Sequence, residues 1–259
     1  MKIWKKILIG CGLVFFPLLL QAQDGKKSSR IGFEFGFNDF LGEVVAPDRV
    51  RPGENIKGGG FFTQSYDNQT LHVPYLGIKI EQYLFEKKIG FGTGLRFSQF
   101  SSAVHGGYVL FSQNSFLWHF REDGNYVDYL SIRNITQDNF YLGIPLEFSY
   151  LLRKRDSFFK PYLKIGAVFN QLLYTKNSVY FDNEIIDEHA YAVGKQVEKP
   201  NSFNYYFYPA LGFKLGKNYN IWGNIEFQFN HFLFSKNVHP FIRPNFGIGI
   251  QFSLHIPIE

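Results

Sequence analysis

Charged side chains recur along the chain at positions that alternate with large apolar residues. Four of them are acidic and four are basic: Glu34, Lys79, Glu81, Arg96, Glu147, Lys164, Lys214 and Glu226. Successive side chains of a β-strand point to opposite faces, so these charges would share one polar face with glycines. A buried charge is tolerated only when it is paired and hydrogen-bonded. The pattern therefore predicts a network of ion pairs on the polar side of a sheet.

Residues that could serve as base, nucleophile or ligand lack the spacing that such chemistry needs. His231 and His239 are expected near one rim with Ser235, but no nucleophile elbow or Ser–His spacing singles them out. Residues 90–94 alternate glycine with other residues, without the strand-to-helix context of a nucleotide loop. One acidic cluster lacks the spacing of a calcium loop: Asp182, Glu184, Asp187, Glu188 and His189. We therefore expect no catalytic, cofactor-binding or metal site, and no enzyme.

Eight segments of about ten residues would carry the charged face. In the last of them the apolar residues at even positions share one face, and glycine or polar residues share the other. The apolar residues are Phe246, Ile248, Ile250, Phe252 and Leu254, and the others are Gly247, Gly249, Gln251 and Ser253. The expected strands are 30–38, 75–85, 89–100, 140–151, 161–174, 205–215, 220–232 and 244–256. The connections alternate between short turns, such as 86–88, and long loops, which is typical of outer-membrane barrels.

The polar face holds too little apolar bulk for a packed core, so the apolar face is expected to contact lipid. A membrane protein made of strands must close, because lipid offers no partner for an open edge. The sequence thus predicts an all-β fold: an eight-stranded antiparallel up-and-down transmembrane β-barrel with long external loops and short periplasmic turns. Eight strands leave an interior just wide enough for side chains to fill, so we expect a plugged lumen and not an open pore.

The first 22 residues are expected to be an export signal. Lys2, Lys5 and Lys6 precede an apolar run over 7–20, which is too short to span a membrane as a helix. The expected organisation is a signal peptide over 1–22 and a barrel over 23–259. Cys11 is the one cysteine of the chain, so the mature part is expected to carry no disulfide. The net charge of +5 comes from scattered residues, which argues against nucleic-acid binding.

Two further expectations concern prolines and aromatic residues. Pro145 and Pro209 lie inside expected strands, where a local bulge would accommodate the missing N–H. Aromatic residues make up 19% of the chain, and several fall near strand ends. Such residues suit girdles at the two membrane interfaces, although some could point into the lumen. They are Tyr75, Tyr83, Tyr141, Tyr150, Tyr162, Tyr174 and Trp222.

Residues 140–150 read FYLGIPLEFSY, and residues 160–166 after the next turn read KPYLKIG. An aromatic-x-x-Ile-Pro strand followed by a Pro-Tyr strand with a glycine resembles the PorT-like family of small outer-membrane β-barrel proteins. This resemblance covers about 30 residues and supplies no catalytic residues. It implies a barrel with a role connected to protein secretion across the outer membrane.

The sequence therefore predicts a non-enzymatic outer-membrane protein with a side-chain-filled lumen. It would act in envelope structure, in interaction, or in PorT-like support of secretion. Its expected partners are outer-membrane lipid and envelope or secretion proteins that contact the external loops. Two alternatives stay open: a lipid-modifying outer-membrane enzyme, and a soluble lipocalin-like carrier with its apolar face inward. The sequence identifies neither a protein partner nor an oligomeric state.

Overall fold

The computed structural model describes most of residues 29–258. The residues it leaves out of that range are 53, 55, 59–67, 85–87, 107, 110–111, 114, 123–125, 153–156, 183–188, 217–220 and 235. The expected signal peptide over 1–22 lies outside the described residues. So do Glu184, Asp187 and Glu188 of the acidic cluster, and Ser235.

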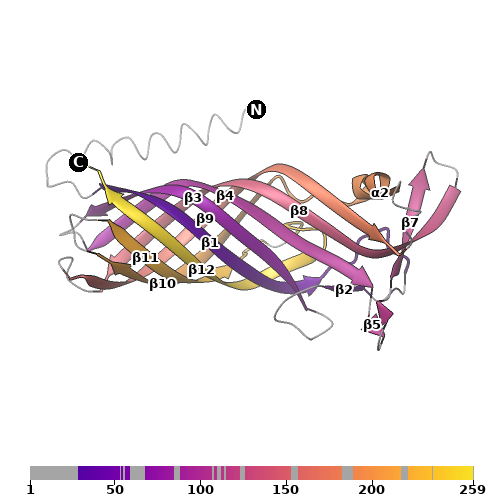
Figure 1. The fold of residues 1–259 in the computed structure, drawn as a ribbon, viewed down its shortest axis with the longest axis horizontal. Helices are drawn as coiled ribbons and strands as arrows, with labels where there is room; N and C mark the ends of the chain where they lie inside the picture. Colours follow the sequence, from indigo (N-terminus) through magenta and orange to yellow (C-terminus); the bar gives the residue numbers. More distant parts are fainter. Residues whose placement is uncertain are drawn as a thin grey trace.

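Eight antiparallel strands form a closed ring. Their bounds are β1 Ser29–Val44, β3 Asn68–Leu84, β4 Ile89–Gly106, β8 Tyr126–Leu151, β9 Phe159–Phe181, β10 Phe203–Leu215, β11 Trp222–His231 and β12 Ile242–Pro257. Each strand pairs with the next of this series, and β12 returns to β1, where Arg30 lies opposite Pro257. The first and last strands therefore bring the two ends of the barrel sequence to the same rim (Figure 1). The predicted fold class is confirmed.

The external end of the protein contains more secondary structure than the sequence indicated. β8 has 26 residues and β9 has 23, so their hairpin extends well past the barrel (Figure 1). Short elements accompany it: β2 Ile56–Gly58, β5 Tyr108–Val109, β6 Ser112–Gln113, β7 Phe116–Glu122 and α2 Ala190–Gln196. The expected strands over 140–151 and 161–174 are therefore too short, because β8 begins at Tyr126 and β9 continues to Phe181. Among the residues that the structure describes, no helix is long and apolar enough to span a membrane.

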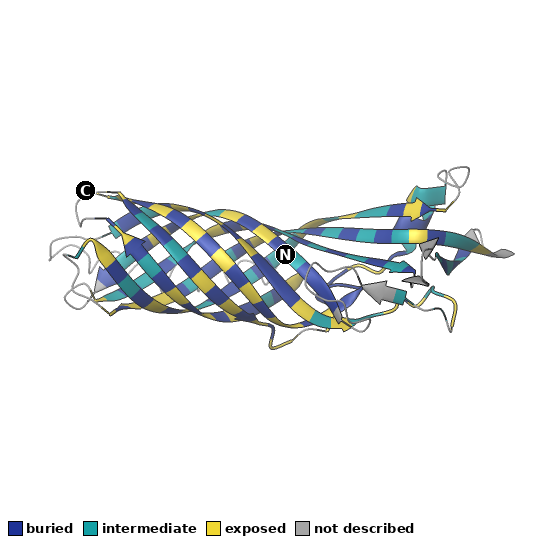
Figure 2. Ribbon diagram, turned by 60° about the horizontal axis from the view of Figure 1, so that its bottom comes forward, coloured by how far each residue is buried: buried dark blue, intermediate teal, exposed yellow. Residues whose placement is uncertain are grey.

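Burial alternates residue by residue around the ring, as the chequered pattern of Figure 2 shows. Phe35 and Ile165 face outward and are 61% and 63% exposed, whereas the neighbouring Glu34 and Lys164 are buried. The wall is thus apolar outside and charged inside. A soluble lipocalin-like carrier requires the opposite arrangement, so that alternative is wrong.

The bulges predicted at Pro145 and Pro209 are wrong. Around Pro145 the β4–β8 register is the same on both sides, with Thr93 opposite Leu146 and Arg96 opposite Gly143. Around Pro209 the β10–β11 register also continues unchanged, although pairing is interrupted for two residues. Proline removes one ladder donor, and both strands bridge that loss without an extra residue. The register shifts lie elsewhere: between Leu41 and Gly42, Ile132 and Asn134, and Phe140 and Tyr141.

Most of the aromatic residues proposed for the interfacial girdles point inward. Five are at most 6% exposed: Tyr75, Tyr83, Tyr141, Tyr162 and Trp222. Tyr150 and Tyr174 do face outward, at 45% and 52% exposure. The sequence left open which of these residues form girdles and which enter the lumen, and the structure assigns these five to the interior. Phenol and indole groups need hydrogen-bond partners when they are buried, and the polar lumen supplies such partners.

Candidate functional site

All eight charged residues singled out in the sequence lie inside the barrel. None is more than 4% exposed, although they come from seven different strands. β12 contributes no charge to this set but adds the inward-facing Gln251 and His255, which are both fully buried. The ring closure therefore places side chains that are up to 192 positions apart in sequence, Glu34 and Glu226, within one enclosed volume.

Glu147 lies at the centre of this lumen network. Its carboxylate oxygens are 2.9 Å from Lys79 Nζ, 2.9 Å from Lys164 Nζ and 3.5 Å from Arg96 Nη2. The Tyr208 hydroxyl donates to the same carboxylate at 2.5 Å. Three cations and one hydroxyl thus converge on a single buried acid, which satisfies its acceptor sites without water.

Lys79 connects this centre to the other acids. Its Nζ lies 3.5 Å from both Glu34 and Glu81 and 3.9 Å from Glu226. The remaining charges attach at the edges, because Arg96 pairs with Glu34 at 2.8 Å, Lys164 with Glu226 at 2.5 Å and Lys214 with Glu81 at 2.8 Å. The eight residues therefore form one connected network in which the four positive and four negative charges balance.

Tyrosine hydroxyls donate further hydrogen bonds to acceptor oxygens of the lumen side chains. Tyr162 donates to Glu226 at 2.5 Å, and Tyr83 donates to Glu81 at 2.7 Å. Tyr75 donates to Gln251 at 3.0 Å, and its ring lies 4.1 Å from the Arg96 guanidinium carbon. From the sequence, these tyrosines were expected either at the membrane interfaces or in the lumen, without a choice between the two. The signal was available, since each shares the odd or even position of the charges on its strand.

Large inward residues are matched by glycine on the neighbouring strand. Tyr162 lies opposite Gly212, and a Cβ built on that glycine would be 2.2 Å from the tyrosine Cζ. The same close approach recurs in three other cross-strand pairs: Tyr75 with Gly36, Tyr83 with Gly90, and Tyr208 with Gly166. Glycine in a strand marks a place where another group approaches closely. The inward glycines therefore make room for the rings that bind the charges.

Further basic side chains line the periplasmic end of the lumen. The Arg30 guanidinium lies 3.5 Å above the Trp222 ring, and Lys160 Nζ lies 4.6 Å from the same ring. His255 Nδ1 is 3.6 Å from Glu81. Lys160 precedes the expected strand over 161–174, whereas Arg30 and His255 fall within the expected strands 30–38 and 244–256 but were not singled out as site residues.

The external end of the lumen is closed by apolar side chains. The cap is the cluster Phe40, Leu71, Val73, Phe100, Tyr141, Val168, Tyr206, Tyr208, Ala210, Phe232, Val238 and Ile242. Phe232 and Val238 belong to the connection between β11 and β12, which therefore turns into the barrel mouth. The lumen thus passes from an aromatic and cationic floor through the ion pairs to an apolar cap.

His239 in this connection predicts a pH effect. Burial lowers the pKa of His239 to about 4, although its ring nitrogen lies 3.1 Å from the Gln137 carbonyl oxygen. The unfolded chain binds the proton at a pKa near 6.5, so stability is complete above that pH and falls as the pH drops towards 4. Between pH 7.5 and 4.5 the loss should be about 2–3 kcal/mol.

Unfolding temperatures of wild type and His239→Gln at the two pH values measure this effect, because the variant removes the titrating ring. The wild type should lose more stability than the variant on acidification. Equal losses in the two proteins would contradict the assignment.

One ionisable pair lies on the outer wall. Asp39 follows the outward Phe37 by two positions, and its Oδ1 is 2.6 Å from His72 Nδ1. The His72 ring also stacks against Phe37, with centroids 6.0 Å apart. Across β4, Ser101 is the register partner of His72. Asp39 follows the expected strand over 30–38, and His72 precedes the expected strand over 75–85, so neither residue was predicted on the wall.

The structure describes part of the acidic cluster considered as a metal site. Asp182 accepts a hydrogen bond from Ser131 at 2.8 Å and pairs with Arg133 at 3.5 Å. Within the described part of the chain, no three or more His, Cys, Asp or Glu side chains are grouped so that they could hold a metal ion. His231, which was weighed as a catalytic base, ends β11.

Comparison with known proteins gave solved structures but no family. No family model matches the chain, and neither does any curated protein. Neisserial surface protein A is 9% identical with a TM-score of 0.41, covering 90% of this chain and 100% of that one. OprG from Pseudomonas aeruginosa is 14% identical with a TM-score of 0.39, over 90% and 95% of the two chains. The Yersinia pestis protein Ail, solved with a heparin analogue, is 8% identical with a TM-score of 0.33, over 89% and 97%.

The class of protein follows from the molecule itself. A closed antiparallel cylinder satisfies its backbone hydrogen bonds without water. In this protein all eight strands of the ring present exposed apolar side chains on the outer wall. The eight charges of the lumen network lie inside, paired and away from solvent. The chain is an outer-membrane β-barrel protein, and it is located in the bacterial outer membrane.

Proposed function

We propose that this protein is a non-enzymatic barrel whose sealed lumen is structural and whose external extension binds an envelope or secretion protein. The single observation that carries the proposal is the packing of that extension. Beyond the barrel, β4, β7, β8, β9 and α2 share a second apolar core. It consists of Val104, Phe116, Trp118, Phe120, Ile132, Ile135, Val179, Phe181, Val193, Val197 and Phe241.

A core of this kind supports a fixed surface outside the membrane. The helix α2 is held against β9 by a hydrogen bond from Asn177 Nδ2 to the Gly194 carbonyl at 2.6 Å. The Trp118 indole reaches Gln196 at 3.4 Å from β7. Holding loops in place lowers the ordering cost of binding, which favours recognition of a partner over passive covering of the barrel.

Exposed tyrosines suggest where a partner would contact this extension. Tyr180 at the end of β9 is 56% exposed, and Tyr191 in α2 is 74% exposed. Tyr129 on β8 is 51% exposed and lies against His119. Tyrosine is enriched at protein interfaces because its ring gives contact area at low entropic cost. The resemblance to the PorT-like family supports a partner connected with secretion.

Photo-crosslinking in intact cells tests the proposal. A benzophenone amino acid in place of Tyr180 or Tyr191 should give a discrete protein adduct. The same residue in place of Tyr174, which is 52% exposed on the outer wall, is the matched control and should give lipid adducts. Absence of protein adducts at both external positions would contradict the proposal.

One observation favours the rival function, a lipid-modifying enzyme. Asp39, His72 and Ser101 follow one another across three adjacent strands of the outer wall, in the order of an acid, a base and a nucleophile. Among the hydrogen bonds of the described residues, however, none joins His72 to Ser101, and hydrolysis requires that contact. A deletion strain with altered lipid acylation, restored by wild type but not by Ser101→Ala, would replace our proposal with this one.

A further inference from the structure

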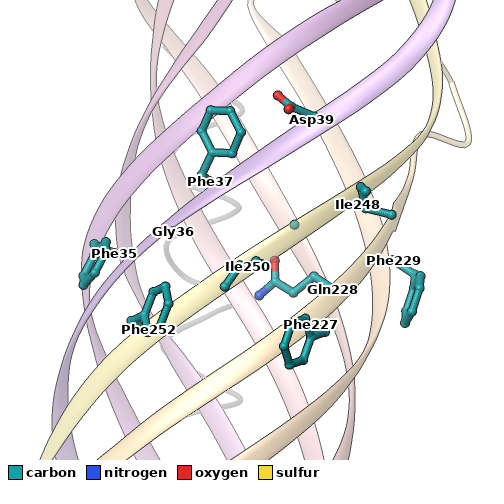
Figure 3. A pocket seen from close by; sticks show the side chains of 11 residues that line it. Phe35, Gly36, Phe37, Asp39, Phe227, Gln228, Phe229, Ile248, Ile250 and Phe252 are labelled. Carbon is teal, nitrogen blue, oxygen red and sulfur yellow. The ribbon is translucent and has the colours of Figure 1, made fainter. Parts of the chain in front are cut away.

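The outer wall contains a hollow at the level of Asp39. It measures about 550 Å³ and lies over β1, β12 and β11 (Figure 3). The aromatic and aliphatic side chains around it stand away from the wall and leave space between them (Figure 3). Its lining residues are Phe35, Gly36, Phe37, Asp39, Phe227, Gln228, Phe229, Ile248, Gly249, Ile250 and Phe252.

Asp39 is the one ionisable residue of that lining, and it lies at the external end of the hollow. Its register partner on β12 is Ile248, and the next outward positions towards the external rim are the exposed Leu41 and Phe246. Two residues of a tilted strand correspond to about 5 Å along the barrel axis, so the carboxylate lies about that far inside the apolar edge. Ionisable groups at such a depth are costly and mark functional sites by default.

Among the side chains that the structure describes, His72 is the one that hydrogen-bonds to the Asp39 carboxylate. His72 Nδ1 contacts Oδ1 at 2.6 Å, and an ionised carboxylate offers about four acceptor positions on its two oxygens. The hollow beside Asp39 opens outward from the wall, so a donor on the membrane side has access to the carboxylate. Charge complementarity favours a cation that carries N–H donors.

We propose that this hollow is a binding site for one membrane lipid with a primary ammonium headgroup. The acyl chain lies between Phe37, Phe229 and Ile250, and the ammonium donates to Asp39. Apolar contact gives the site its affinity, and the charged hydrogen bond gives it headgroup selectivity. A quaternary ammonium lacks the donor, and an anionic headgroup has the wrong charge. This inference goes beyond the proposed function and does not depend on it.

Native mass spectrometry of the protein released from vesicles tests the site. The vesicles contain equal amounts of phosphatidylethanolamine, phosphatidylcholine and phosphatidylglycerol of identical chain composition. We expect one retained lipid, with phosphatidylethanolamine favoured roughly fivefold over each of the others, which corresponds to about 1 kcal/mol. Asp39→Asn should remove the preference, and Ile248→Trp, which fills the hollow, should remove the retained lipid.

The matched control is Asp138→Asn. Asp138 is also an acid of the outer face, bound to Gln99 at 3.1 Å, but it lies on β8, outside the hollow. This variant should keep the preference, and heat-dependent gel migration should show that all three variants are folded. Equal retention of the three lipids, a preference that survives Asp39→Asn, or retention of detergent alone would overturn the proposal.

Discussion

Glu147→Gln is expected to lower the free energy of unfolding by about 3–5 kcal/mol. The substitution keeps the shape of the side chain but removes the negative charge on which Lys79, Lys164 and Arg96 converge, at 2.9, 2.9 and 3.5 Å. Three buried cations would then share the remaining acids. Breaking a buried ion pair costs far more than the pair itself contributes, because the partner stays buried without compensation.

Urea titration of the folded protein in vesicles, read from the fraction that migrates as the compact form on unheated gels, measures this loss. The control is Glu43→Gln, since Glu43 is exposed near the external end of β1. That change should stay within about 0.5 kcal/mol of wild type. Equal effects of the two substitutions would show that the lumen network does not stabilise the barrel.

Gly212→Ala is the second substitution with a large expected effect. Its added Cβ would lie 2.2 Å from Cζ of Tyr162, whose hydroxyl donates to Glu226 at 2.5 Å. The ring has to move and the hydrogen bond to a buried carboxylate has to lengthen. Overpacking of this kind costs about 1–3 kcal/mol before the lost hydrogen bond is added.

Gly223→Ala is a matched control for this prediction, because a Cβ at that position meets nothing within 4 Å. The urea midpoint should fall for Gly212→Ala and stay near wild type for Gly223→Ala. If both glycines tolerate alanine equally, the pairing of inward tyrosines with glycines is not a packing requirement.

Strand identity was predictable because one rule controls it. Every substitution of a charge for an apolar residue on the lipid side is penalised, so the two faces separate along the whole ring. Glu34 between Phe33 and Phe35 illustrates this, as does Lys164 between Leu163 and Ile165. Parity alone therefore placed the eight charges on one face before their contacts were known.

Other features depend on neighbours that one strand does not reveal. The space that the Tyr162 ring occupies in the lumen depends on Gly212 lying opposite, and that pairing requires the register of β9 and β10. The external extension was missed because its apolar residues do not follow a lipid-facing pattern; Trp118 and Phe181 pack into a core instead. Asp39 was missed because a charge on the outer wall contradicts the rule that located the strands.

Labelling with a hydrocarbon-soluble diazirine in native membranes tests the central claim, that the apolar face contacts lipid and the charged face is enclosed. Residue-level mass spectrometry of the wild-type protein should find label on Phe252 and Leu254, which are 39% and 47% exposed on the outer wall. The intervening Ser253, which faces inward, should carry none, and neither should Lys79. Label on Ser253 and Lys79 with Phe252 and Leu254 unlabelled would contradict the account.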